Sequence, residues 1–180
     1  TPTPGYYPLP GFVQNDNGDL IGLTSGNGTN SNGTIFSLPL SNSSFTTQAT
    51  FNGTAGVVKG ASPRGSLIKH SNGWFYGTTE LGGANNLGTL FKFKPATATA
   101  IAQYVAVVEF TGNGTTKKGE YPNATLLDGG DGYLYGTTYS GGSTDYGTVF
   151  KLKVSDETFT PLATFTNAAS PTPGKWPIAQ

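Results

Sequence analysis

The chain has 180 residues, enough for one domain of ordinary size with its own hydrophobic core. Only 11% of the residues are charged, and ten basic side chains balance ten acidic ones, so no net field favours nucleic acid or an anionic membrane as a partner. The sequence contains no Cys, which excludes both a disulfide framework and a thiolate metal site.

Gly, Thr, Ser and Asn are abundant, and Phe and Tyr supply most of the aromatic residues. This composition favours β-sheets over helices. No apolar run approaches the ~18 residues that a membrane-spanning helix needs, so no membrane insertion is expected. The sequence also has no Met and no signal peptide, which indicates a processed or truncated product. A low-charge, Cys-free chain rich in Thr, Asn and Gly is typical of exported surface proteins, so we expect an extracellular or cell-surface protein.

The first copy of a repeated pattern follows a proline-rich opening. Residues 1–11 contain too many prolines for a central strand. An Asn17-Gly18 pair between two short apolar runs predicts a hairpin turn. Residues 53–63 are predicted to be a glycine-rich connection to the second copy. The strands predicted for this copy are residues 12–13, 20–21, 33–38 and 46–51.

The second copy carries the clearest hairpin of the chain. Residues 72–79 (NGWFYGTT) combine a turn pair with an aromatic strand, and residues 88–93 (GTLFKF) supply the returning strand. Alternation in the returning strand puts Phe91 and Phe93 on the buried face and Lys92 on the other. Two further strands complete this copy, at residues 66–69 and 104–110.

The same hairpin occurs three times. Residues 131–138 (DGYLYGTT) and 147–152 (GTVFKL) repeat it 59 residues later, where Phe150 and Leu152 are predicted to be buried and Lys151 to face the other way. Residues 17–24 and 33–38 are a more divergent copy 55 residues earlier. The remaining strands of the third copy are predicted at residues 125–127 and 158–165.

The spacing of the copies defines the domain organisation. Prolines recur before each copy at intervals of 55, 59 and 55 residues. This predicts an all-β chain of three tandem four-stranded antiparallel repeats, each the size of one β-propeller blade. A lone blade cannot bury both faces, so we expect a partial propeller or a segment of a longer array. The predicted repeats are residues 8–62, 63–121 and 122–176, and residues 1–7 and 177–180 belong to flanking repeats.

The two ends of the chain resemble each other. Residues 1–9 align with residues 170–178 at an offset of 169, which equals three repeat lengths. An isolated closed propeller has no need for the same segment twice. The overlap predicts either a longer array or a subunit whose residues 170–180 enter the position that residues 1–11 occupy in the next copy.

The pattern Leu-Tyr-Gly-Thr-Thr, Gly-Gly, Gly-Thr-Val-Phe-Lys-Leu in residues 134–152 resembles the GloVer (Gloeobacter/Verrucomicrobia) tandem repeat of exported bacterial proteins. The second copy differs slightly, with Phe93 in place of the last Leu. The first copy differs more, because Ile21 replaces the Tyr and Leu23 replaces a Thr. The resemblance covers nearly the whole chain. It implies a β-propeller-like architecture and an extracellular or surface setting, and it brings no catalytic residues.

Residues suited to catalysis or metal binding are few. His70 is the only His, which argues against a triad or a His-based metal site. Asp128 and Asp131 could act as a glycosidase pair, but they lie in a Gly-rich turn where Asp is locally favoured. Residues 15–19 resemble the start of a calcium loop and lack its distal Glu. No catalytic residue, metal site or cofactor is predicted.

Aromatic side chains are the candidate ligand-binding residues. At blade edges they could form platforms on which sugars stack, although most such aromatics pack sheets or blades together. Trp74 and Tyr76 should share one strand face, and Tyr133 and Tyr135 should occupy the equivalent face of the third copy. These candidates are Trp74, Tyr76, Tyr133, Tyr135 and Tyr146.

The sequence as a whole predicts a non-enzymatic extracellular structural or adhesive repeat module. Its partners would be copies of itself, in a homo-oligomer or filament, or further repeats of the same chain. The alternative is a lectin-like carbohydrate-binding module that holds glycans on aromatic side chains between blades. Glycan arrays test the second hypothesis, and electron microscopy of the native material tests the first.

Overall fold

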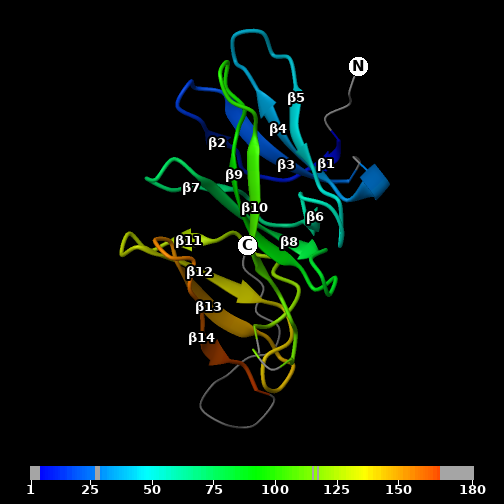
Figure 1. Cartoon of the computed structure of the whole chain (residues 1–180), viewed down its shortest axis with the longest axis vertical. Coiled ribbons are helices and arrows are strands. Elements are labelled where there is room, and N and C mark those ends of the chain that lie inside the picture. Colours follow the sequence, from blue (N-terminus) through cyan, green and yellow to red (C-terminus); the bar gives the residue numbers. More distant parts are fainter. Residues whose placement is uncertain (1–4, 27–28, 115, 117, 167–180) are drawn as a thin grey trace.

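The structure is a computed structural model that describes residues 5–26, 29–114, 116 and 118–166. Within these ranges the chain is all-β, with three antiparallel sheets and one short 3-10 turn, η1 (Thr29–Ser31). The three sheets follow one another along the longest axis of the molecule (Figure 1). The described ranges contain no helix with the length and apolarity needed to cross a membrane.

The first sheet has the strand order β1-β3-β4-β5. The short strand β2 pairs with β3, which is also the partner of β1. All its pairings are antiparallel. The central hairpin is the one predicted around residues 17–38, and η1 lies in its loop. The strand bounds are Tyr6–Pro8 for β1, Val13–Gln14 for β2, Leu20–Gly26 for β3, Thr34–Leu38 for β4 and Thr46–Thr50 for β5.

The second sheet repeats this layout with the order β10-β9-β8-β6, and β7 pairs with β8. The third sheet has the order β11-β12-β13-β14. An isolated bridge between Glu120 and Ser140 takes the place that β6 has in the second sheet. The bounds are Ala61–Pro63 for β6, Ile68–Lys69 for β7, Phe75–Leu81 for β8, Thr89–Lys94 for β9, Gln103–Glu109 for β10, Leu127–Asp128 for β11, Tyr133–Thr138 for β12, Thr148–Lys153 for β13 and Phe159–Thr164 for β14.

A shared irregularity shows that the sheets are copies of one unit. The pairing of the last two strands shifts register in every sheet, in β4/β5, β9/β10 and β13/β14. The shift lies between Ile35 and Phe36 in the first sheet, opposite Leu90 and Phe91 in the second, and between Val149 and Phe150 in the third. A β-bulge at one repeated position bends the last strand of each sheet in the same way.

The opening strands of the first two sheets were not predicted. Residues 53–63 form more than a connection, because β6 pairs with the end of β8, and β1 pairs with the end of β3 in the same way. Both strands end in Pro and lie at a sheet edge, where a missing N–H costs no ladder bond. Their middle residues, Tyr7 and Ser62, have φ values of 56° and 50°. Strands of three residues with such a kink leave no period-2 signal.

Residues 1–4 and 170–180, on which the predicted overlap of the two chain ends depends, lie outside the described ranges.

The predicted inward and outward alternation along β9 and β13 is confirmed. Phe91, Phe93, Phe150 and Leu152 are fully buried. The intervening Lys92 and Lys151 are only partly buried. Each sheet therefore has a face that carries a buried Phe, which we call the Phe face, and an opposite face, which we call the aliphatic face. The Phe faces contain Phe36, Phe91 and Phe150, and the aliphatic faces contain Ile35, Leu90 and Val149.

Candidate functional site

The interface between neighbouring sheets is built twice from equivalent residues. Between the first and second sheets, the Phe face of the second packs on the aliphatic face of the first. A single apolar cluster forms there, comprising Ile21, Leu23, Ile35, Phe51, Leu67, Phe75, Phe91 and Phe93. Between the second and third sheets the same relation gives a cluster of Tyr76, Leu90, Val108, Phe110, Leu126, Leu134, Phe150 and Leu152.

Aromatic rings reinforce each Phe face. Phe91 stacks on Tyr104 with ring centroids 5.3 Å apart, and Phe150 lies 5.0 Å from Phe159. The first sheet has the equivalent pair of Phe36 and Phe45 at 5.4 Å. Burial raises the pKa of Tyr104, whose hydroxyl donates to the Lys59 carbonyl. Such pairs add stabilisation beyond their buried area.

Backbone hydrogen bonds tie each sheet to the next. The Ser62 N–H donates to the Asn32 carbonyl of the first repeat at 2.8 Å. In the same way, the Tyr121 N–H donates to the Leu87 carbonyl of the second repeat at 2.9 Å. The left-handed φ at Ser62 and Tyr121, 50° and 54°, accompanies this arrangement in both repeats. Neighbouring repeats are therefore joined at equivalent places by polar as well as apolar contacts.

Charged contacts between sheets are fewer and more exposed. Lys69 of the second sheet reaches Asp16 of the first at 2.6 Å, and Lys92 reaches Glu157 of the third at 2.5 Å. The His70 imidazole lies 3.9 Å from Asp128. Asp128 thus lies close to the neighbouring repeat. Exposed pairs of this kind contribute little to stability, so apolar contact dominates the interface.

The predicted aromatic residues fall into different surroundings. Tyr76 is buried between the second and third sheets, and its hydroxyl accepts a hydrogen bond from the Asn72 amide at 3.1 Å. Trp74 packs at the edge of the same interface, with the Lys92 and Lys94 ammonium groups 4.6 and 4.9 Å from its ring centroid. These two residues are part of the contact between the second and third sheets.

The equivalent residues of the third sheet lie on its aliphatic face, which no other sheet of the described residues covers. Tyr133 and Tyr135 are only partly buried, with ring centroids 6.4 Å apart. Lys151 lies over the Tyr133 ring at 4.2 Å, as Lys92 lies over Trp74. Tyr146 lies in the connection between β12 and β13, at the other end of that hairpin from Tyr133. The structure therefore does not bring the five aromatics together in one site.

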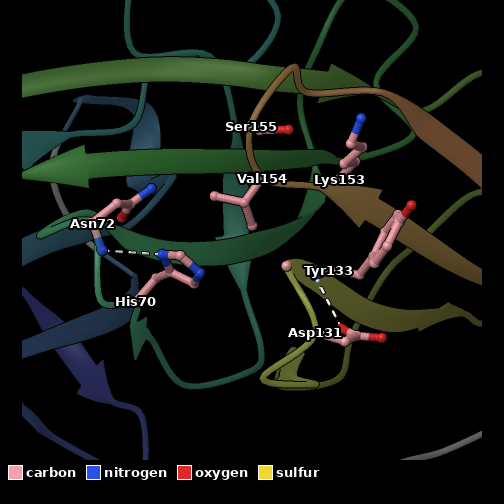
Figure 2. Close-up of a pocket in the computed structure, with 8 residues that line it drawn as sticks. His70, Asn72, Asp131, Tyr133, Lys153, Val154 and Ser155 are labelled. Carbon is pink, nitrogen blue, oxygen red and sulfur yellow. Dashed lines mark hydrogen bonds between the residues drawn. The ribbon is translucent and has the colours of Figure 1, made fainter.

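A hollow of about 620 Å³ lies between the turn that precedes β8 and the third sheet. Figure 2 shows His70 and Asn72 on one side of it, and Asp131, Tyr133 and Lys153 on the other. The Tyr135 hydroxyl donates to Asp131 at 2.7 Å and is the main cause of the lowered pKa of that carboxyl. The Asp156 carboxylate raises the pKa of Lys153. The hollow thus carries a carboxylate and an ammonium group at neutral pH.

The described residues contain no group of three or more His, Cys, Asp or Glu that could hold a metal ion. In residues 15–19, which resemble the start of a calcium loop, the Asn15 carboxamide accepts hydrogen bonds from the N–H groups of Asn17 and Asp19 at 3.0 and 2.8 Å. Such bonds are typical of a turn closed by its own side chain.

Sequence reasoning missed one repeated feature, a pair of buried Thr hydroxyl groups in contact at one end of each hairpin. The signal was present, since a Thr recurs ten residues after another Thr in every copy. The pairs are Thr24–Thr34, Thr79–Thr89 and Thr138–Thr148.

Comparison with known proteins identifies one family. The sequence model described as the Gloeobacter/Verrucomicrobia repeat matches residues 1–179. No curated protein and no solved structure matches the chain.

Proposed function

The chain belongs to the Gloeobacter/Verrucomicrobia repeat family, and we propose that it is a non-enzymatic extracellular structural or adhesive module that self-assembles or continues into a longer repeat array. One observation carries this proposal. The Phe face of one sheet covers the aliphatic face of the preceding sheet, and this happens twice within the chain. Each added repeat would form the same contact again, as in other proteins whose repeats contact only their neighbours.

The two ends of the stack support the proposal. Large apolar side chains are exposed at both, including Phe12 at 52% on the first sheet and Leu127 at 65% on the third. Exposed apolar side chains at the two ends are suited to contact with a further repeat. The low charge and the richness in Thr, Asn and Gly support an extracellular or cell-surface setting.

Light scattering across a concentration series of the purified chain, with electron microscopy of the same samples, tests the proposal. We expect masses above the 18.6 kDa of one chain that grow with concentration. Because the contact is apolar, association should persist in about 1 M salt, which screens surface ion pairs. A single 18.6 kDa species at every concentration contradicts self-assembly.

A second candidate function is carbohydrate binding in the hollow of Figure 2. The observation that favours it is that the Tyr133 ring lines the same hollow as the polar groups of Asn72 and Asp131, since aromatic faces and precisely placed hydrogen-bonding groups are what small-molecule sites combine. A glycan array with Tyr133→Ala tests it. Loss of binding in this variant, and retention in Tyr6→Ala, whose ring is 61% exposed elsewhere, is the expected result.

A further inference from the structure

Within the described residues, the aliphatic face of the third sheet lacks the cover that the other two aliphatic faces have. On the first and second sheets Ile35 and Leu90 are fully buried beneath the next sheet. The equivalent Val149 is only partly buried. Leu162 of β14, on the same sheet, is 48% exposed. Within the described residues, no sheet follows the third to cover this face.

The Phe face of the first sheet is the complementary half. Leu67 and Leu126 are equivalent residues of the second and third repeats, and each is only 4% exposed because it packs on the preceding sheet. Phe12 occupies the same repeat position in the first repeat and is 52% exposed. It packs edge to face on Phe36. Phe12 is thus an interface residue with no preceding sheet to cover it among the described residues.

A hollow of about 190 Å³ on the third sheet marks the place that a following repeat would fill. Tyr135, Thr137 and Val149 line it. At the equivalent place on the second sheet, Leu126 of the following repeat contacts the cluster that contains Tyr76 and Leu90. The interior geometry therefore predicts a large apolar side chain, equivalent to Leu126, over the hollow.

A buried hydroxyl supports the same conclusion independently. Thr78 Oγ1 donates to the Ala124 carbonyl of the following repeat at 3.2 Å. The equivalent Thr137 Oγ1 is buried and has no hydrogen-bond partner within the described ranges. A buried hydroxyl without a partner is costly. The repeat position of Ala124 corresponds to Pro10 in the first repeat, whose carbonyl accepts one bond, from Ser66 Oγ at 2.5 Å, and has a second lone pair.

We propose that the aliphatic face of the third sheet binds the Phe face of the first sheet of a second copy of this chain. Phe12 of the second copy then takes the place of Leu126, and its Pro10 carbonyl accepts the Thr137 hydroxyl. The contact is head-to-tail and uses a different face on each copy, so it grows into a ring or a filament. This inference rests on the proposed self-assembly and names its surfaces.

Two complementary variants test the pairing. Phe12→Asp removes the apolar side chain on the first sheet, and Val149→Asp puts a charge on the third. Each should weaken association by on the order of 100-fold, because a carboxylate would be buried without a partner. In sedimentation velocity each variant alone should be a monomer, whereas an equimolar mixture should form one-to-one dimers through the two remaining intact faces.

The outcomes separate this inference from the proposed function. If the unmodified chain assembles but the mixture forms no dimers, or if either variant alone assembles normally, the head-to-tail pairing is wrong and self-assembly stands. If the unmodified chain stays monomeric, both fail. Near-ultraviolet circular dichroism of each variant shows whether it remains folded.

Site-specific disulfides give a second measurement that does not depend on disruptive variants. The sequence has no Cys. When a Pro10→Cys chain is mixed with a Thr137→Cys chain, every disulfide that forms therefore joins introduced cysteines. The matched control is Thr78→Cys with Ala124→Cys in one chain, which reproduces the geometry internally. We expect a disulfide between the two introduced cysteines that joins one chain to the other. The proposed pairing is overturned if the control chain forms its internal disulfide but no disulfide joins Cys-substituted positions 10 and 137 of two chains. The reason is that a disulfide forms only between residues whose Cα atoms lie close together.

Discussion

Thr79 Oγ1 and Thr89 Oγ1 lie 2.8 Å apart, with both residues fully buried at the end of the central hairpin. Thr79 Oγ1 also donates to the Leu81 carbonyl at 2.8 Å, so the pair belongs to a short hydrogen-bonded chain. The first and third sheets have the same arrangement. The recurring Gly-Thr motifs of the sequence thus place a buried Thr–Thr hydrogen bond between the two strands of each hairpin.

Replacing Thr89 by Val should destabilise the fold by roughly 1–3 kcal/mol, because the shape is kept while the buried Thr79 hydroxyl loses one of its two hydrogen-bond partners. Urea unfolding followed by fluorescence measures this change. The control is the double variant Thr79→Val with Thr89→Val. Since both hydroxyls are then absent, it should cost less than the sum of the two single variants. Strict additivity would show that the hydroxyls do not interact.

Gly77 and Gly136 are required for close packing beneath a Phe ring. A Cβ at Gly77 would lie 2.8 Å from the Phe91 ring, and one at Gly136 would lie 2.4 Å from the Phe150 ring. Val at either position should therefore destabilise the protein by roughly 1–3 kcal/mol through overpacking. Thermal unfolding measures the change. Gln103→Val, on an exposed strand position, is the control and should leave the midpoint nearly unchanged.

Phe91 and Phe150 are fully buried, so truncating either ring removes only surface that is hidden from solvent. Ala at either position should cost ~3–5 kcal/mol, the sum of lost burial and a residual cavity. Chemical denaturation checks this figure. Ile101→Ala is the comparison, since Ile101 is 85% exposed and its truncation should change stability little. Equal effects at Phe91 and Ile101 would contradict the interface described above.

Glu109 should make stability depend on pH. Partial burial acts to raise the pKa of its carboxyl, but hydrogen bonds from Lys59 at 2.7 Å and the Ala84 N–H at 2.5 Å outweigh it and lower the pKa below 4.5. The unfolded chain therefore binds this proton first as pH falls. The contribution of Glu109 is present above about pH 4.5 and is lost as pH falls through its folded pKa.

Unfolding curves at pH 7 and pH 3 for the unmodified chain and Glu109→Gln check this dependence. The variant should be less stable at neutral pH and should lose less stability on acidification. Glu157→Gln, which removes the partly exposed ion pair with Lys92, is the second carboxylate control and should change stability little. An identical acid response in the unmodified chain and Glu109→Gln would remove Glu109 as a source of the effect.

Much of the fold was accessible from the sequence because the pattern occurs three times. Alternation around Phe91 and Phe150 predicted the buried faces, and those predictions are confirmed. The edge strands at Tyr6–Pro8 and Ala61–Pro63 were missed, since they are too short for a periodic signal and contain Pro. The candidate aromatics were selected by residue type, which does not distinguish Tyr76, buried beneath the next sheet, from Tyr135, which is only partly buried on a face that no described sheet covers.

The sequence by itself determined the repeat, the strand register and the family, because alternation and turn residues act over a few neighbouring positions. Only the tertiary structure decided which face of each sheet meets which. Contacts such as Leu126 on the second sheet, or the Thr78 hydroxyl on the Ala124 carbonyl, join residues of different repeats. Those contacts depend on the stacking of whole sheets, which no local pattern specifies. They distinguish the two covered aliphatic faces from the third, which no sheet of the described residues covers.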